Sequence, residues 1–171
     1  EHWIDGSSTA SHSKQRLPVA DPSTGQDYAD CPRGDSKDID AAVNAAQRAF
    51  PAWSRLKPSQ RAAWLNRLAD AVEARFEDFV QCESRNTGKP LSLLRTVEIP
   101  RTIANFRFFA AQCQLTLDQA FHGEAGMNYT LHQALGTVGV ISPWNLPLYL
   151  LSWKLAPALA AGNCVIAKPS E

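Results

Sequence analysis

The feature that most constrains the fold of this 171-residue chain lies near its end, where two short apolar runs enclose a long apolar segment. Residues 137–141 form a β-branched run typical of a buried strand, and residues 164–167 form a second one. Between them, Pro147 can begin a helix over 148–161, which Gly162 can end. This order of strand, helix and strand predicts a right-handed βαβ unit, the element of parallel α/β sheets.

Ligands of such sheets bind beyond the carboxyl ends of the strands, where two loops of this unit are expected. The first loop holds Asn145, whose amide could donate to a developing oxyanion or could cap the following helix. The second loop holds Lys168 and Glu171, which could bind ribose hydroxyls or form a surface ion pair. Lys154, inside the apolar helix, needs a partner and so predicts either a structural ion pair or a proton path. The glycine pattern of a conventional dinucleotide-binding turn is absent from the sequence.

The preceding residues predict short strands and then helices. Turn-forming residues crowd positions 1–34, so brief strands are expected there. Apolar spacing predicts a helix that Ser36 caps and that ends near Phe50, before Pro51. A long helix over about 59–86 should stop at Gly88, and a third should cover about 90–114. Residues 129–135 alternate loosely, which predicts an exposed strand.

Charge and cysteine content exclude several classes of protein. The 17 basic and 17 acidic residues cancel, and no Lys/Arg run offers a surface for nucleic acid. No apolar run is long enough for a membrane span. The four cysteines are too widely spaced for a compact disulfide framework, which favours a reducing, cytoplasmic location. Position 1 is not Met and the chain stops just after an apolar run, so we expect both ends to lie within a longer protein.

Several segments together resemble the aldehyde dehydrogenase superfamily. The matching segments are 139–147 (GVISPWNLP), 153–163 (WKLAPALAAGN), 167–171 (AKPSE), 3–6 (WIDG), 21–25 (DPSTG) and 86–90 (NTGKP). The resemblance implies the amino-terminal part of a Rossmann-type, parallel-sheet NAD-binding domain of the α/β class, truncated, with an oligomerisation strand. By this resemblance, residues 1–125 begin that domain, 126–137 form the oligomerisation strand, and 138–171 form its first βαβ unit.

The family mechanism assigns roles to matching positions. A cysteine thiolate attacks the aldehyde, hydride passes to the nicotinamide, and water hydrolyses the resulting thioester. Asn145 matches the residue that stabilises the oxyanion, and Lys154 matches a lysine proposed in some members to relay protons. The positions implied for cofactor binding are Ile141, Ser142, Trp144, Lys168, Ser170 and Glu171. A carboxylate at Glu171 would repel a 2′-phosphate, which favours NAD over NADP.

Residues 99–101 (IPR), 105–110 (NFRFFA) and 143–151 (PWNLPLYLL) resemble the branch that oxidises 2-aminomuconic or 2-hydroxymuconic semialdehyde in aromatic and tryptophan breakdown. In that branch the arginine matching Arg101 holds the substrate carboxylate, as a guanidinium can with two parallel hydrogen bonds. The alternative for Arg101 is a surface side chain paired with Glu98. The alternative functions for the protein are a broad-specificity or betaine-aldehyde-type dehydrogenase, and a non-catalytic cofactor-binding or interaction module.

The resemblance also shows what these residues lack. The catalytic Cys, the general-base Glu and the glycine-rich cofactor turn match none of these 171 residues, so the chain alone is expected to be inactive. Asn86 stands where many members have Asp, which leaves open a monovalent cation site near Val19, Ala20 and Asn86. The implied partners are a small-molecule aldehyde and further copies of the chain in a homodimer or homotetramer, with neither nucleic acid nor membrane.

Overall fold

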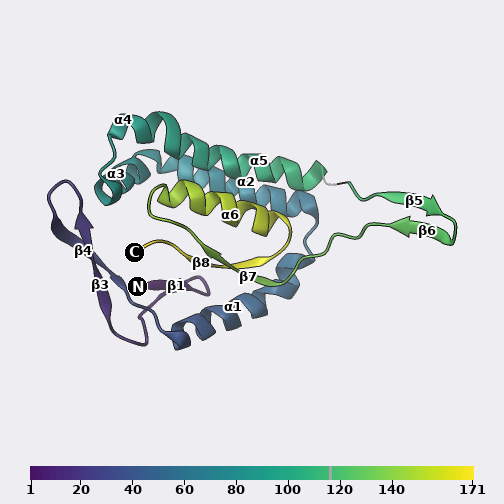
Figure 1. Cartoon of the computed structure of the whole chain (residues 1–171), viewed down its shortest axis with the longest axis horizontal. Coiled ribbons are helices and arrows are strands. Elements are labelled where there is room, and N and C mark those ends of the chain that lie inside the picture. Colours follow the sequence, from purple (N-terminus) through teal and green to yellow (C-terminus); the bar gives the residue numbers. More distant parts are fainter. Residues whose placement is uncertain (116) are drawn as a thin grey trace.

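The computed structural model describes residues 1–115 and 117–171 (Figure 1). Its elements, in order, are β1 (His2–Ile4), β2 (Ser7–Thr9), β3 (Arg16–Asp21), β4 (Gln26–Pro32), α1 (Ser36–Ser54), α2 (Pro58–Ala74), α3 (Phe76–Thr87), α4 (Leu91–Leu93), the π-helix η1 (Leu94–Glu98), α5 (Ile99–Leu115), β5 (Ala120–Gly123), β6 (Gly126–Tyr129), β7 (Thr137–Ile141), α6 (Pro147–Ala160) and β8 (Cys164–Lys168). The pairs β1–β2, β3–β4 and β5–β6 are antiparallel, whereas β7–β8 is parallel. Among the described residues, no helix has the length and apolar character needed to cross a membrane.

The βαβ unit predicted from the sequence is present as β7, α6 and β8. Its strands pair from Thr137 opposite Cys164 to Ile141 opposite Lys168, so β8 runs one residue past its predicted end. Gly162, at φ +87°, turns the chain out of α6. The buried Asn163 side chain then accepts the N–H groups of Leu135 and Gly136, at 2.7 and 3.1 Å, and ties the end of α6 to the start of β7. The α/β fold class is confirmed.

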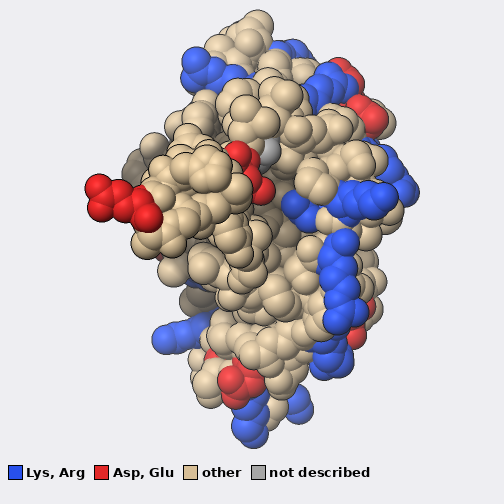
Figure 2. All heavy atoms as spheres, turned by 90° about the vertical axis from the view of Figure 1, so that its right-hand side faces the viewer, with Lys and Arg blue, Asp and Glu red and all other residues tan. Residues whose placement is uncertain are grey.

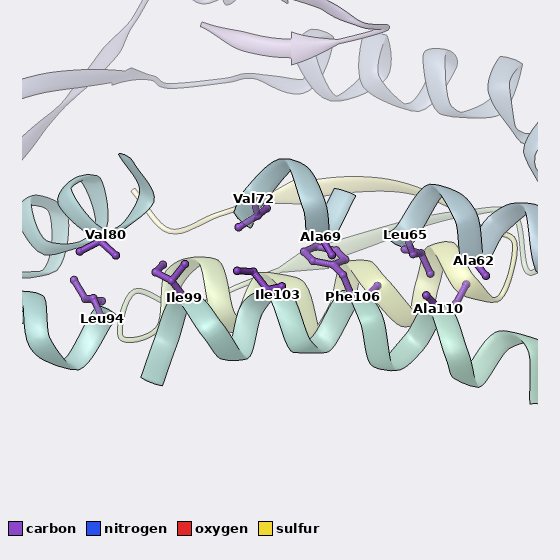
Figure 3. Close-up of a cluster of buried hydrophobic side chains, with 12 residues drawn as sticks. Ala62, Leu65, Ala69, Val72, Val80, Leu94, Ile99, Ile103, Phe106 and Ala110 are labelled. Carbon is purple, nitrogen blue, oxygen red and sulfur yellow. The ribbon is translucent and has the colours of Figure 1, made fainter. Parts of the chain in front are cut away.

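The hydrophobic core lies where α2 and α6 pack against α5, and α1 covers the β7–β8 pair away from α6 (Figure 1). Figure 3 shows Ala69 and Val72 of α2 facing Ile103 and Phe106 of α5. Small alanines at these contacts let the helices approach closely, and burial of the larger side chains stabilises the packing. The buried Asn105 amide donates a hydrogen bond to the Ser152 hydroxyl at 2.9 Å, which fixes α5 against α6.

Three helix boundaries differ from those predicted. Asp35, not Ser36, caps α1, because its carboxylate accepts the N–H groups of the first turn in a reciprocal capping box. The same helix continues through Pro51, and its last turn is anchored by the Trp53 indole, which donates to the Leu159 carbonyl at 3.2 Å. The predicted second helix is two helices, because Arg75 leaves helical geometry at ψ +28°.

The strand predicted over 129–135 is wrong, because pairing ends at Tyr129. A tight turn between Gly123 and Gly126 joins β5 to β6, so the paired residues lie earlier, at 120–129. Figure 1 shows this hairpin extending away from the helices. Figure 2 views the molecule from that side, where basic side chains gather along one flank and the surface nearest the viewer is mostly uncharged. The hairpin exposes Phe121, Met127 and Tyr129.

Candidate cofactor and oxyanion site

Asn145 lies in the loop between β7 and α6, beyond the carboxyl end of β7, and its side chain is exposed. The helix-capping alternative for this residue is wrong. The N-cap position belongs to Leu146, and no side-chain cap bond is made there. The N–H of Leu148 in the first turn of α6 instead donates to the Glu83 carboxylate, at 3.0 Å. The Asn145 amide is therefore free of helix capping.

The second predicted loop, after β8, lies against the first. The Ser142 N–H donates to the Lys168 carbonyl at 3.2 Å, which joins the two strand ends. The Lys168 ammonium lies 3.4 Å from the Glu171 carboxylate, and both side chains are exposed. The backbone N–H of Glu171 and the Lys168 side chain lower the pKa of this carboxyl group. Glu171 therefore stays ionised at neutral pH.

The residues at this edge of the sheet fit a nucleotide cofactor. Ile141 and Trp144 are 69% and 75% exposed, which offers apolar surface for a ring to contact. The Ser142 hydroxyl is buried and has no hydrogen-bond partner within the described residues. A buried hydroxyl without a partner is costly, so this group is suited to a ligand atom. Lys168 and Glu171 add one charge of each sign.

Lys154 is not the buried member of an ion pair. Its side chain is exposed on α6, and its ammonium donates to the backbone carbonyl of Ile141 at the end of β7. The ion-pair alternative is therefore wrong, because the partner is a neutral carbonyl. The contact brings Lys154 to the same strand end as the predicted cofactor residues.

Arg101 lies on α5 beside the first turn of α6. Its guanidinium carbon is 5.7 Å from the centre of the Tyr149 ring, a cation–π contact. The alternative pairing with Glu98 is wrong, because Glu98 binds Lys89 instead. Within the part of the chain that the structure describes, Arg101 forms no ion pair and its side chain is exposed. The structure thus leaves this guanidinium accessible near the Asn145 loop.

Sequence reasoning missed three charged residues beneath that loop: Glu83, Lys89 and Glu98. The Lys89 ammonium binds both Glu98 oxygens, at 2.7 and 2.9 Å, and also the Asn145 carbonyl. Burial raises the pKa of Glu83, and the Glu98 charge raises it further, against the opposing effects of the Leu148 N–H and Lys89. The turn at 86–90, which holds Lys89, was the sequence signal for this group. Glu83 and Glu98 gave none, because the burial of an acidic residue on a helix leaves no pattern in the sequence.

The residues named for a monovalent cation lie in two elements. The β3–β4 register shifts between Val19 and Ala20, and the Asn86 side-chain oxygen accepts the Tyr28 hydroxyl at 3.3 Å. Across residues 1–115 and 117–171, no group of three or more His, Cys, Asp or Glu side chains could hold a metal ion. The monovalent cation site stays a prediction.

Comparison with known proteins supports the resemblance found in the sequence. The model of the aldehyde dehydrogenase family matches residues 8–171. The chain is 52% identical to 2-aminomuconic semialdehyde dehydrogenase of Mus musculus, over 88% of this chain and 31% of that protein. It is 41% identical to 2-hydroxymuconic semialdehyde dehydrogenase of Pseudomonas sp. (strain CF600), over 100% of this chain and 36% of that protein.

A crystal structure of PnpE in complex with nicotinamide adenine dinucleotide superposes with a TM-score of 0.92. The identity is 38%, over 96% of this chain and 34% of PnpE. The chain thus spans about a third of the length of the relatives that it matches. The family match over nearly all of the chain decides its membership: this chain belongs to the aldehyde dehydrogenase family.

Proposed function

We propose that the protein containing this chain is an NAD-dependent dehydrogenase that oxidises an aldehyde to a carboxylic acid. The observation that carries the proposal is Asn145, an exposed amide beyond the end of β7 that takes no part in capping α6. It lies in a loop joined through Ser142 to the residues suited to a nucleotide. The family match adds the reaction type.

In this reaction a cysteine thiolate, supplied by a part of the family fold outside these residues, adds to the aldehyde carbon. The carbonyl electrons move onto oxygen, and the Asn145 amide donates to that oxyanion in the thiohemiacetal. The bound NAD supplies a hydride acceptor, which leaves a thioester that water hydrolyses to the acid. Lys154 is assigned to move protons at the end of β7, where it binds the Ile141 carbonyl.

Six residues would hold the cofactor: Ile141, Ser142, Trp144, Lys168, Ser170 and Glu171. Ile141 and Trp144 would contact it through apolar surface, and the Ser142 hydroxyl would gain the partner that it lacks. An ionised Glu171 would accept the ribose hydroxyls and repel a 2′-phosphate, which favours NAD over NADP. The NAD complex of PnpE supports the same choice.

Replacing Glu171 tests the cofactor preference. In the full-length protein, Glu171→Ala should raise KM for NAD roughly 10-fold, since it removes a charged acceptor of the ribose hydroxyls. Glu171→Gln keeps an acceptor without the charge, so it should retain more of the NAD affinity and admit NADP. Initial rates with both cofactors measure the two effects, with Asp40→Ala, the loss of an exposed carboxylate on α1, as a control. An unchanged NAD/NADP ratio in both Glu171 variants would contradict this role.

The substrate class that we propose is a muconic-type semialdehyde, with 2-aminomuconic and 2-hydroxymuconic semialdehyde as its members. Relatives named for these substrates match the chain, and the accessible Arg101 suits a substrate with a carboxylate. The same guanidinium would repel betaine aldehyde, which is cationic. A role in aromatic and tryptophan breakdown follows from this substrate class.

NADH formation by the full-length protein tests the function directly. With NAD, 2-hydroxymuconic semialdehyde should give a higher kcat/KM than hexanal, and betaine aldehyde should give the lowest. Preference for hexanal would favour a broad-specificity dehydrogenase. Cofactor binding without turnover of any aldehyde would favour a non-catalytic module.

We further propose a cytoplasmic homodimer or homotetramer that uses the β5–β6 hairpin and the 126–137 segment as a contact. Phe121, Met127 and Tyr129 give the hairpin an exposed apolar surface. The four cysteines are free thiols, in keeping with a reducing compartment. In the full-length protein, Met127→Glu should shift the elution of the assembly toward smaller species in size-exclusion chromatography. An unchanged elution volume with a folded variant would argue against a contact at this hairpin.

A further inference from the structure

Two buried carboxylates, Glu83 and Glu98, and the half-buried Lys89 lie beneath the Asn145 loop; we call these three residues the charge cluster. Glu98 is 4% exposed and its two oxygens bind the Lys89 ammonium. An ammonium has three N–H donors, and the third contact of Lys89 is the Asn145 carbonyl. Glu83 accepts the N–H of Leu148. The charge cluster therefore holds the chain at two points, the Asn145 carbonyl in the loop and the Leu148 N–H in the first turn of α6.

The local fold explains how Lys89 and Glu98 meet. Gly88 ends α3 at φ +73°, a left-handed conformation that turns the chain so that Lys89 follows outside the helix. Glu98 is the last residue of the π-helix η1, whose wider turn shifts the side chains that follow it relative to an α-helix. A buried carboxylate is stable only when it is paired and hydrogen-bonded. The turn after α3 thus supplies the Lys89 ammonium at the place where η1 supplies the Glu98 carboxylate.

Glu83 completes the arrangement at the start of α6. Pro147 has no N–H, and Leu146 makes no side-chain cap, so the first turn of α6 lacks an acceptor from its own segment. The Glu83 carboxylate, on α3, provides that acceptor for Leu148. Negative charge at a helix N-terminus is favourable. The Asn145 carbonyl and the first turn of α6 are thereby held by the Lys89–Glu98 pair and by Glu83.

We propose that Lys89, oriented by Glu98, and Glu83 are positioning residues that hold the backbone of the Asn145 loop so that the Asn145 amide meets the oxyanion. This inference rests on the proposed function of Asn145. Donors to a transition state are effective when they are held in place before the reaction. Small displacements of such a donor cost rate, because its hydrogen bond depends on distance and angle.

The test is a double-mutant cycle in the full-length protein. Lys89→Met keeps the alkyl chain and removes the donor, so kcat should fall about 10-fold with little change in KM for NAD. In an Asn145→Ala background the same replacement should leave kcat nearly unchanged, because no amide remains to be positioned. The matched control is Arg95→Met. Arg95 lies on η1, and its replacement removes an exposed ion pair with Glu77 that does not contact the loop.

Glu83 gives an independent arm of the test. Glu83→Leu removes the acceptor for Leu148 and should lower kcat, whereas Glu83→Gln keeps an acceptor and should recover most of the loss. If Lys89→Met fails to fold because Glu98 is left unpaired, Lys89→Met with Glu98→Leu replaces the whole pair by apolar groups and is measured in the same two backgrounds.

The outcomes separate this inference from the function on which it rests. Equal loss of kcat with and without Asn145 would make Lys89 merely structural and overturn the inference. A large loss in Asn145→Ala with none in Lys89→Met and none in Glu83→Leu would also overturn it, but would leave the proposed function intact. If Asn145→Ala itself leaves kcat unchanged, the oxyanion role and the inference both fall.

Discussion

Replacing Asn145 with alanine in the full-length protein is expected to lower kcat by roughly 10²–10³-fold and to leave the affinity for NAD nearly unchanged. The amide would donate only to the oxyanion of the transition state and intermediate, so its loss leaves binding of the ground state almost intact. Its side chain is exposed and does not cap α6, so the fold should tolerate the change.

Asn163 provides the matched control in the same βαβ unit. Its buried amide accepts the Leu135 and Gly136 N–H groups and donates to the Ala158 carbonyl at 3.2 Å. Asn163→Ala should therefore lower the melting temperature and leave kcat of the folded protein near its original value. Stopped-flow turnover and thermal melting of both variants separate the two roles. A stable Asn145→Ala enzyme with undiminished kcat would remove Asn145 from the mechanism.

The βαβ unit could be predicted because its signals are local. A β-branched run, Pro147 at the start of a helix and Gly162 at its end each restrict the backbone by themselves, and β7, α6 and β8 lie where these signals place them. The place of the Asn145 loop beyond the end of β7 could be predicted for the same reason, since ligand sites of parallel sheets follow strand ends.

Other features depend on contacts between distant segments. The last turn of α1, past Pro51, is held by a hydrogen bond from the Trp53 indole to the Leu159 carbonyl, more than a hundred residues away in the sequence. The break at Arg75 has no Pro or Gly close to it that would indicate it. The charge cluster was missed because helical spacing does not reveal that Glu83 and Glu98 are buried around one lysine. Tertiary packing outweighs local propensity at each of these places.

We expect substrate choice to depend on a second residue, Arg101, on α5. The cation–π contact with Tyr149 places its guanidinium beside the first turn of α6, just after the Asn145 loop. Glu98, the acidic residue nearest to Arg101 in the sequence, is paired with Lys89 and so does not compete for the Arg101 guanidinium. A substrate with an aldehyde at one end and a carboxylate at the other could therefore meet Asn145 and Arg101 together.

Arg101→Ala in the full-length protein is expected to raise KM for 2-hydroxymuconic semialdehyde roughly 10–100-fold, or about 1.5–3 kcal/mol, the range for hydrogen bonds to a charged group. Arg101→Lys should recover only part of this loss, because an ammonium cannot present two parallel donors to a carboxylate. KM is to be measured for this aldehyde and for hexanal, which has no carboxylate and should respond little.

The matched control is Arg107→Ala on the same helix, where the arginine pairs with Asp70 and Glu73 on α2. An exposed pair of this kind contributes little, so KM for both aldehydes should stay unchanged. The comparison distinguishes carboxylate recognition from a general effect on α5, because only recognition depends on the charge of the substrate. If Arg101→Ala raises KM equally for both aldehydes, or for neither, Arg101 does not bind the carboxylate, and the muconic-type substrate loses its main physical support.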